Sequence, residues 1–89
     1  MSRMFVKDPE AILDYSFDWE QWLDGDTLST STWAADSGIT IDSSSRTSTV
    51  STVWLSGGTN KLDYEITNTI TTATGRTDER TFTIKVRNR

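Results

Sequence analysis

Residues 62–71 alternate, except at Asn68, between apolar or aromatic and polar side chains. Leu62, Tyr64 and Ile66 share one parity, and the positions between them are acidic residues or threonine. A period of two places successive side chains on opposite faces of a β-strand, so this stretch predicts a half-buried strand and excludes a helix. Residues 81–87 repeat the alternation, which predicts a hairpin of two long strands. Such a hairpin is only marginally stable until a second layer covers its apolar face.

The earlier part of the chain supplies strands for this second layer. Residues 13–19 alternate large apolar with polar side chains, and residues 27–55 contain three more short strands between polar turns. Strands spaced by about 8 to 12 residues are typical of an immunoglobulin-like fold. We therefore predict an all-β protein, an immunoglobulin-like β-sandwich of six or seven antiparallel strands over residues 10–89, preceded by an N-terminal arm of residues 1–9.

The parity of each strand predicts which side chains form the core. Tyr64 follows a glycine-rich turn at the start of the penultimate strand, and its hydroxyl is expected either to bond the backbone of that turn, as in a tyrosine corner, or to reach solvent. Residues 18–23 are expected to form one helical turn that covers an end of the sandwich. The predicted core comprises Leu13, Tyr15, Phe17, Trp19, Leu28, Ile39, Ile41, Val53, Leu55, Leu62, Tyr64, Ile66, Ile70, Phe82, Ile84 and Val86.

The composition excludes most enzyme chemistry. Serine and threonine supply 27 of the 89 residues, which suits solvated β-sheet faces, and the chain contains neither Cys nor His. Disulfides, thiolate or imidazole metal sites and Ser-His or Cys-His nucleophile pairs are thereby excluded. The one dense group of acidic residues, within residues 14–26, lacks the spacing of a calcium loop, so we interpret it as a solvated face. We predict a protein that is not an enzyme and that has no cofactor or metal.

Charge is divided unevenly along the chain. Residues 1–45 carry nine acidic and two basic side chains, a net −7, whereas residues 46–89 carry four acidic and seven basic ones, a net +3. Either interleaved strands cancel this asymmetry in space, or the molecule is polar and stacks head to tail. The formal net charge of −4 argues against nucleic acid as a partner. No run of 18 apolar residues is present, which argues against a membrane span.

Four tryptophans supply an alternative function. Trp19 and Trp22 have a structural place in the turn at residues 18–23, which leaves Trp33 and Trp54 available for exposure. Exposed aromatic rings form platforms for sugars. A small carbohydrate-binding or adhesin-type immunoglobulin-like module is therefore the alternative to a purely structural role.

Three segments carry a family resemblance: residues 7–23 (KDPEAILDYSFDWEQWL), residues 52–59 (TVWLSGGT) and residues 75–87 (GRTDERTFTIKVR). They resemble the phage fiber-tail adaptor family of small tailed-bacteriophage proteins. The resemblance implies a non-enzymatic structural component of the virion, assembled in the host cytoplasm, that connects tail proteins to fibers. The implied partners are other phage tail or head-tail proteins and the tail fiber. The family carries no catalytic motif to transfer.

Virion connectors of this kind form rings, in which each copy meets its neighbour through two different patches. We expect a buried apolar segment to supply most of the affinity and opposite charges to set the register. The apolar arm packs either on its own domain or on a neighbour, and we predict the second use in the assembled ring. The predicted partner interface comprises Met4, Phe5, Asp24, Asp26, Trp33, Arg76 and Arg80.

Overall fold

A computed structural model describes residues 3–88 of the chain. They form seven strands and one short helix: β1 (Arg3–Lys7), β2 (Leu13–Asp18), α1 (Glu20–Leu23), β3 (Leu28–Ala35), β4 (Ile39–Arg46), β5 (Val50–Gly57), β6 (Asp63–Thr72) and β7 (Thr77–Val86). Within this described part, no helix is long and apolar enough to cross a membrane.

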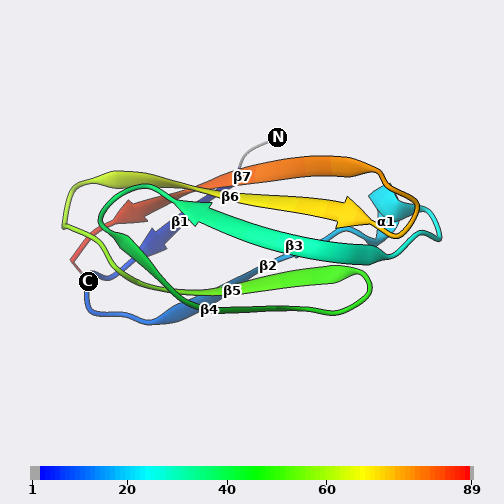
Figure 1. The fold of residues 1–89 in the computed structure, drawn as a ribbon. Helices are drawn as coiled ribbons and strands as arrows, with labels where there is room; N and C mark the ends of the chain where they lie inside the picture. Colours follow the sequence, from blue (N-terminus) through cyan, green and yellow to red (C-terminus); the bar gives the residue numbers. More distant parts are fainter. Residues whose placement is uncertain (1–2, 89) are drawn as a thin grey trace.

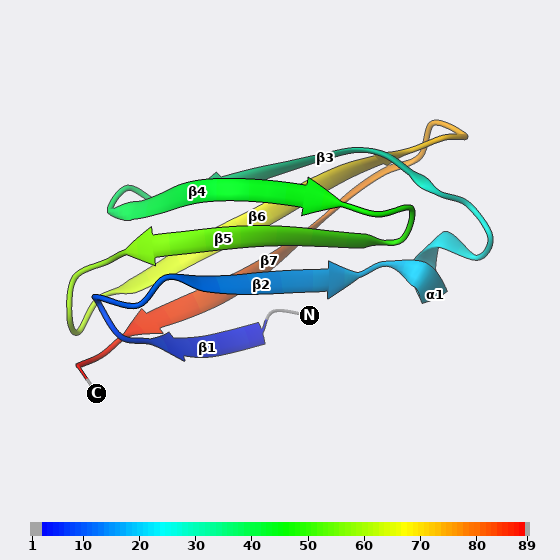
Figure 2. The same cartoon turned by 90° about the horizontal axis from the view of Figure 1, so that it is seen from below.

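The strands form two sheets that pack face to face (Figure 1). The larger sheet has the order β1-β7-β6-β3, and the smaller has the order β2-β5-β4. Figure 2 shows the smaller sheet in front, with α1 at one end of the sandwich and the C-terminus at the other. The predicted all-β fold and number of strands are confirmed. The prediction that every strand is antiparallel is wrong at one edge, where β1 pairs parallel with β7.

The predicted C-terminal hairpin, β6 and β7, lies at the centre of the larger sheet. Ile66 and Ile84 point into the sandwich and are fully buried. On the outer face of the same hairpin, the Thr67 and Thr81 hydroxyls are hydrogen-bonded at 3.0 Å. The alternation therefore separates a dry inner face from a hydroxyl-rich outer face, as expected for a sheet with one side in water. The buried hydrophobic core comprises Phe17, Trp19, Leu23, Leu28, Ile39, Val53, Leu55, Tyr64, Ile66, Ile70, Phe82, Ile84 and Val86.

Two predicted core residues are exposed. Leu13 is 37% exposed because it begins β2 at the open end of the sandwich. Leu62 is 51% exposed because the backbone turns at Lys61, with φ of 75°, and the pairing of β6 with β7 begins only at Asp63. Tyr15 and Ile41 are half-buried against the core, and Leu23 joins the core from α1. Parity identifies the inner face of a strand but does not show where the second sheet stops covering it.

The hydroxyl of Tyr64 accepts a hydrogen bond of 2.9 Å from the backbone N–H of Thr59, in the preceding turn. This contact confirms the tyrosine corner. The Tyr64 ring also requires glycine at position 38, since a Cβ placed on Gly38 would lie 2.8 Å from the ring. Gly38 has a φ of 109°, which L side chains rarely adopt. The ring and the turns at this end of the sandwich therefore constrain one another.

Residues 3–7 of the predicted arm form the edge strand β1. The Phe5 ring packs on Tyr15 and Phe82, at centroid distances of 5.0 and 5.4 Å. Lys7 is fully buried, and its ammonium donates to the carbonyl oxygens of Asp8 (2.9 Å) and Gly57 (2.8 Å). Burial lowers the pKa of Lys7, although the nearby carboxylates of Asp8 and Asp42 partly oppose this shift. In the structure, β1 is thus anchored to its own domain.

A buried polar chain crosses the core from one sheet to the other. The Trp19 indole donates to the side-chain oxygen of Asn68 (3.1 Å), and the Asn68 amide donates to the Ser31 hydroxyl (3.0 Å) and the Thr32 carbonyl (2.9 Å). The Ser31 hydroxyl is in turn hydrogen-bonded to that of Ser51. Asn68 is the one polar residue on the apolar parity of residues 62–70, and these contacts satisfy its amide inside the protein.

Candidate functional site

The residues predicted for partner contact separate into a surface group and a core group. Asp24, Asp26 and Arg76 lie together at the end of the sandwich that carries α1. Arg80 lies close to this group: its guanidinium covers the buried Trp19 ring at 4.1 Å. We define the α1 end as the surface formed by α1, the α1–β3 turn and the β6–β7 loop, and it is the candidate site.

The α1–β3 turn has a local cause. Asp24 and Gly25 both have positive φ, 48° and 91°, so two successive left-handed residues end α1 and redirect the chain into β3. Glycine adopts this conformation without a steric penalty, and aspartate is among the residues that tolerate it. The turn therefore positions the next residue, Asp26, beside the β6–β7 loop.

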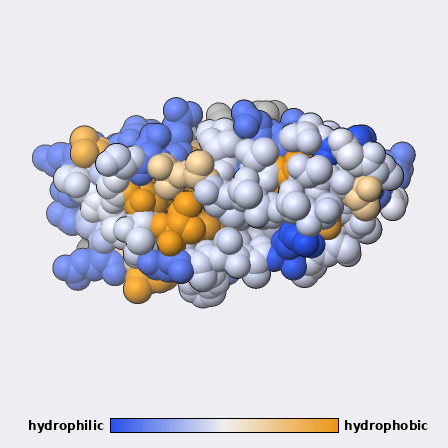
Figure 3. Space-filling model, in the orientation of Figure 1, coloured by the Kyte–Doolittle hydropathy of each residue, from blue (hydrophilic) through white to orange (hydrophobic). Residues whose placement is uncertain are grey.

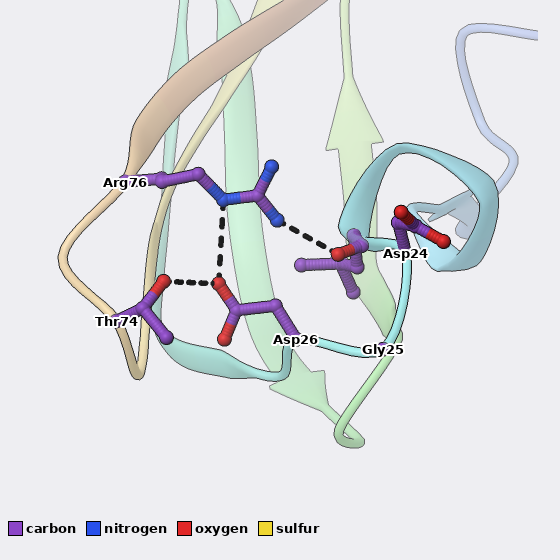
Figure 4. A pocket seen from close by; sticks show the side chains of 6 residues that line it. Asp24, Gly25, Asp26, Thr74 and Arg76 are labelled. Atoms are coloured by element: carbon purple, nitrogen blue, oxygen red, sulfur yellow. Dashed lines mark hydrogen bonds and ion pairs between the residues drawn. The ribbon is translucent and has the colours of Figure 1, made fainter.

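The Asp26 carboxylate joins the two loops (Figure 4). It accepts hydrogen bonds from the Thr74 hydroxyl (2.6 Å), Arg76 Nε (3.3 Å) and the Thr27 backbone N–H (2.8 Å). Hydrogen bonds from Thr74 and Thr72, followed by those from Thr27 and Arg76, hold the pKa of Asp26 well below its usual range, against a smaller opposing effect of burial. The carboxylate is thus held ionised by its neighbours.

Arg76 also binds the end of the helix. Its guanidinium donates to the Leu23 carbonyl at 2.8 Å and lies 4.4 Å from the centre of the Trp22 ring. The last turn of α1 contains no basic residue, so the cation that its terminal carbonyls favour comes from the β6–β7 loop. One side chain thereby ties α1, the α1–β3 turn and the hairpin loop together.

These contacts bear on the uneven distribution of charge along the sequence. Asp26 belongs to the acidic part of the sequence and Arg76 to the basic part, yet they form an ion pair within one chain. At the opposite end, Arg87 and Asp63 form a second ion pair at 3.2 Å. Part of the linear asymmetry is therefore cancelled inside the molecule.

The α1 end presents two open hollows. One, of about 360 Å³, is lined by Leu23, Asp24, Gly25, Asp26, Thr74 and Arg76. The other, of about 460 Å³, is lined by Asp18, Glu20, Gln21 and Arg80. In Figure 4 the Asp24 carboxylate points away from Arg76, toward the outside of the turn. Among the residues that the structure describes, no group of three or more acidic side chains is arranged to hold a metal.

The core group is placed differently. Phe5 and Trp33 both pack against Phe82, and Trp33 also stacks on Phe17 with ring centroids 5.9 Å apart. Trp33 is therefore half-buried. The Met4 side chain lies outside the residues whose side chains are described.

Trp54 has a different environment from Trp33. It is 42% exposed on the outer face of β5, the central strand of the smaller sheet. Asp14 on β2 and Ser43 on β4 lie beside it in the strand register. Trp54 is therefore the tryptophan of this pair that is available to a ligand or partner.

Thr74 and Trp22 belong to the α1 end but were not predicted as part of the interface. Thr74 donates to Asp26 across 48 positions of the sequence. A hydroxyl in a polar loop carries no signal of such a contact, and Trp22 is explained equally well as a residue of the helical turn. The pairing is visible only once the topology brings the β6–β7 loop next to α1.

The Asp26→Asn variant is expected to show a smaller loss of stability in acid than the wild type. The wild-type carboxylate has a lowered pKa when folded, so its stabilisation is complete above its ordinary pKa of 3.8 and is lost as the pH falls through the lower folded value. Urea unfolding at a series of pH values between about 6 and 2 measures this difference. Asp24→Asn removes a charge from the same turn and is the control. Parallel acid profiles for Asp26→Asn and the wild type would contradict the role of this carboxylate.

Comparison with known proteins adds one finding. The model of a family described as podophage GP4 fiber-tail adaptor protein gp77 matches residues 7–85. No curated protein matches the chain. The match includes the whole α1 end but only the last residue of β1.

Proposed function

Because the chain belongs to the podophage GP4 fiber-tail adaptor family, we propose that it is a non-enzymatic part of the phage virion that connects tail proteins to the fiber. The family match is the observation that carries this proposal. A structural adaptor in the tail needs a rigid body with defined surfaces, and a sandwich with a continuous buried core supplies one. The same proposal includes assembly in the host cytoplasm and ring formation, with other tail or head-tail proteins as partners.

We also propose that the sandwich is immunoglobulin-like. Three observations support this assignment: two packed sheets, a tyrosine corner, and a parallel edge strand that leads into the smaller sheet. The domain then extends over residues 10–89, with residues 1–9 as its N-terminal arm. In this structure the arm contributes β1, so its use on a neighbouring copy requires the Phe5 contacts to be exchanged for equivalent ones.

The α1 end is the surface that we propose for the tail partner. Arg76 and Asp26 hold it rigid, so docking orders few additional side chains and loses little conformational entropy. The exposed acidic groups Glu20 and Asp24 border its hollows and are free to steer a basic partner. Arg76 and Arg80 contact Leu23 and the Trp19 ring within the chain, and because they also line the two hollows they stay part of the proposed interface.

The Glu20→Lys variant is expected to fold normally but to incorporate into tails at least about tenfold less efficiently than the wild type, because it reverses a charge at the docking surface. The assay is reconstitution of tails that lack the protein with purified variants, followed by quantification of bound chain. Glu10→Lys makes the same change in the exposed loop between β1 and β2, at the opposite end, and should incorporate normally. Equal incorporation of both variants would exclude the α1 end as the docking surface.

Carbohydrate binding remains the second candidate because Trp54 is exposed among hydroxyl and carboxylate side chains. An adaptor without this activity shows no saturable change in tryptophan fluorescence when it is titrated with sugars. Saturable quenching that disappears in Trp54→Ala would support the alternative.

A further inference from the structure

The open edge of β3 differs from the other sheet edges. β1 is five residues long and contains Arg3 and Lys7, and β4 has a register shift after Ile41 and contains charged residues. Short length, charge and bulges are the usual means by which edge strands avoid pairing with other chains. β3 is eight residues long and contains no charged residue and no proline. Its only register shift lies between Leu28 and Thr30, which leaves the rest of the strand regular.

The backbone of β3 offers a template for another strand. Asp36 N–H donates to the Glu65 carbonyl, and in an antiparallel ladder the groups that face the neighbour alternate. Ser31, Trp33 and Ala35 consequently direct their N–H and C=O groups away from β6. Thr32 and Ala34 are exposed between them. The side of the sandwich with β3 and β4 faces the viewer in Figure 3, where most of the surface is intermediate in hydropathy and the largest apolar group lies in the left half of the view.

We infer that in the free protein β3 pairs antiparallel with β3 of a second copy. A second copy presents the same uncharged edge, so no like charges oppose each other along the two β3 strands, and the small exposed side chains of Thr32 and Ala34 let the two edges approach. Centring the pair on Trp33 uses all three outward-facing residues and places Thr32 of one copy opposite Ala34 of the other. The two larger sheets then form one continuous sheet around a two-fold axis.

This contact is independent of the proposed tail role. A two-fold pair of identical edges differs from the head-to-tail contacts of a ring, and the β3 edge is a different surface from the α1 end. Failure of the β3 pairing would leave the α1 end and its incorporation test untouched. Conversely, the Glu20→Lys variant should still pair through β3 even when it no longer incorporates into tails.

Cysteine cross-linking tests the register, because the chain contains no cysteine of its own. Thr32→Cys and Ala34→Cys variants, mixed and oxidised, are expected to form a disulfide with each other, since opposed non-hydrogen-bonded residues bring their Cβ atoms close enough. Thr69→Cys lies on the same outer face but in the interior strand β6, and it should not cross-link to Thr32→Cys. Absence of the Thr32–Ala34 disulfide overturns the proposed register.

Sedimentation of the full chain at micromolar to millimolar concentration tests the pairing itself. A dimer is expected, and Ala34→Lys should weaken it at least about tenfold by placing a charge on the edge. Thr69→Lys, which adds the same charge one strand inward, should leave dimerisation within about twofold of the wild type. A monomer throughout this range, or a dimer unaffected by Ala34→Lys, overturns the inference.

Discussion

The Ile84→Ala variant is expected to lose roughly 2 to 5 kcal/mol of unfolding free energy. Ile84 is fully buried in β7, opposite Tyr64 on β6 and Phe5 on β1. Truncation removes apolar contacts and leaves a cavity between neighbours that are fixed by two strand ladders, so the site cannot collapse fully. Urea denaturation with an unchanged m-value measures the loss.

Thr83→Ala is the matched control for this experiment. Thr83 is the neighbour of Ile84 on the outer face of the same strand, and its truncation should change stability by less than about 0.5 kcal/mol. Domains of this size are stable by only about 5 to 15 kcal/mol, so the Ile84 effect is a large fraction of the total. A loss below about half a kcal/mol for Ile84→Ala would mean that β7 faces the other way.

The features that are predicted best depend only on residues that lie close together in the sequence. Parity alone predicts that Phe82 and Ile84 lie in the core, and the turn before Tyr64 predicts two positions for its hydroxyl, of which the tyrosine corner is observed. The exposed ends of strands were not predictable in this way. Leu62 has the parity of the core, but whether a second sheet reaches over it depends on packing that the local pattern does not contain.

Extended structure was also missed where hydrophobicity is low. Residues 43–45 are three consecutive serines, without the apolar alternation that predicts a strand, yet they belong to β4. A strand at the edge of a sheet can be exposed along much of its length, so it need not show a period of two. Backbone pairing with β5, rather than side-chain burial, makes this segment a strand.

The candidate site was predicted in part. Its charged residues are predicted from the sequence as contacts between copies, and this use stays a prediction. In the structure, Asp26 and Arg76 are 50 positions apart and bind each other. Charge alone carries no information on whether its partner is in the same chain. The topology decides this question, because it places the β6–β7 loop beside the α1–β3 turn.

The Asn68→Asp variant is expected to lose roughly 3 to 5 kcal/mol at pH 7, the cost of an uncompensated charge in the core. Asn68 is fully buried, and its amide group donates both to Ser31 and to the Thr32 carbonyl. A carboxylate cannot donate either bond, and it places a negative charge against that carbonyl oxygen. Thr69→Val, on the outer face of the same strand, controls for polar substitutions in β6 and should cost less than about 0.5 kcal/mol.

The pH dependence separates this buried charge from a loss of packing. Burial raises the pKa of a carboxyl group, so the folded Asn68→Asp variant takes up a proton at a higher pH than its unfolded chain. Its deficit relative to the wild type should therefore shrink as the pH falls from 7 toward 4, since the folded state then binds more protons. Asp26 contributes equally to both proteins and cancels in the difference. A deficit that is constant with pH would contradict a buried charge at position 68. The chain of hydrogen bonds from Trp19 through Asn68 to Ser31 would then not depend on the exclusion of water.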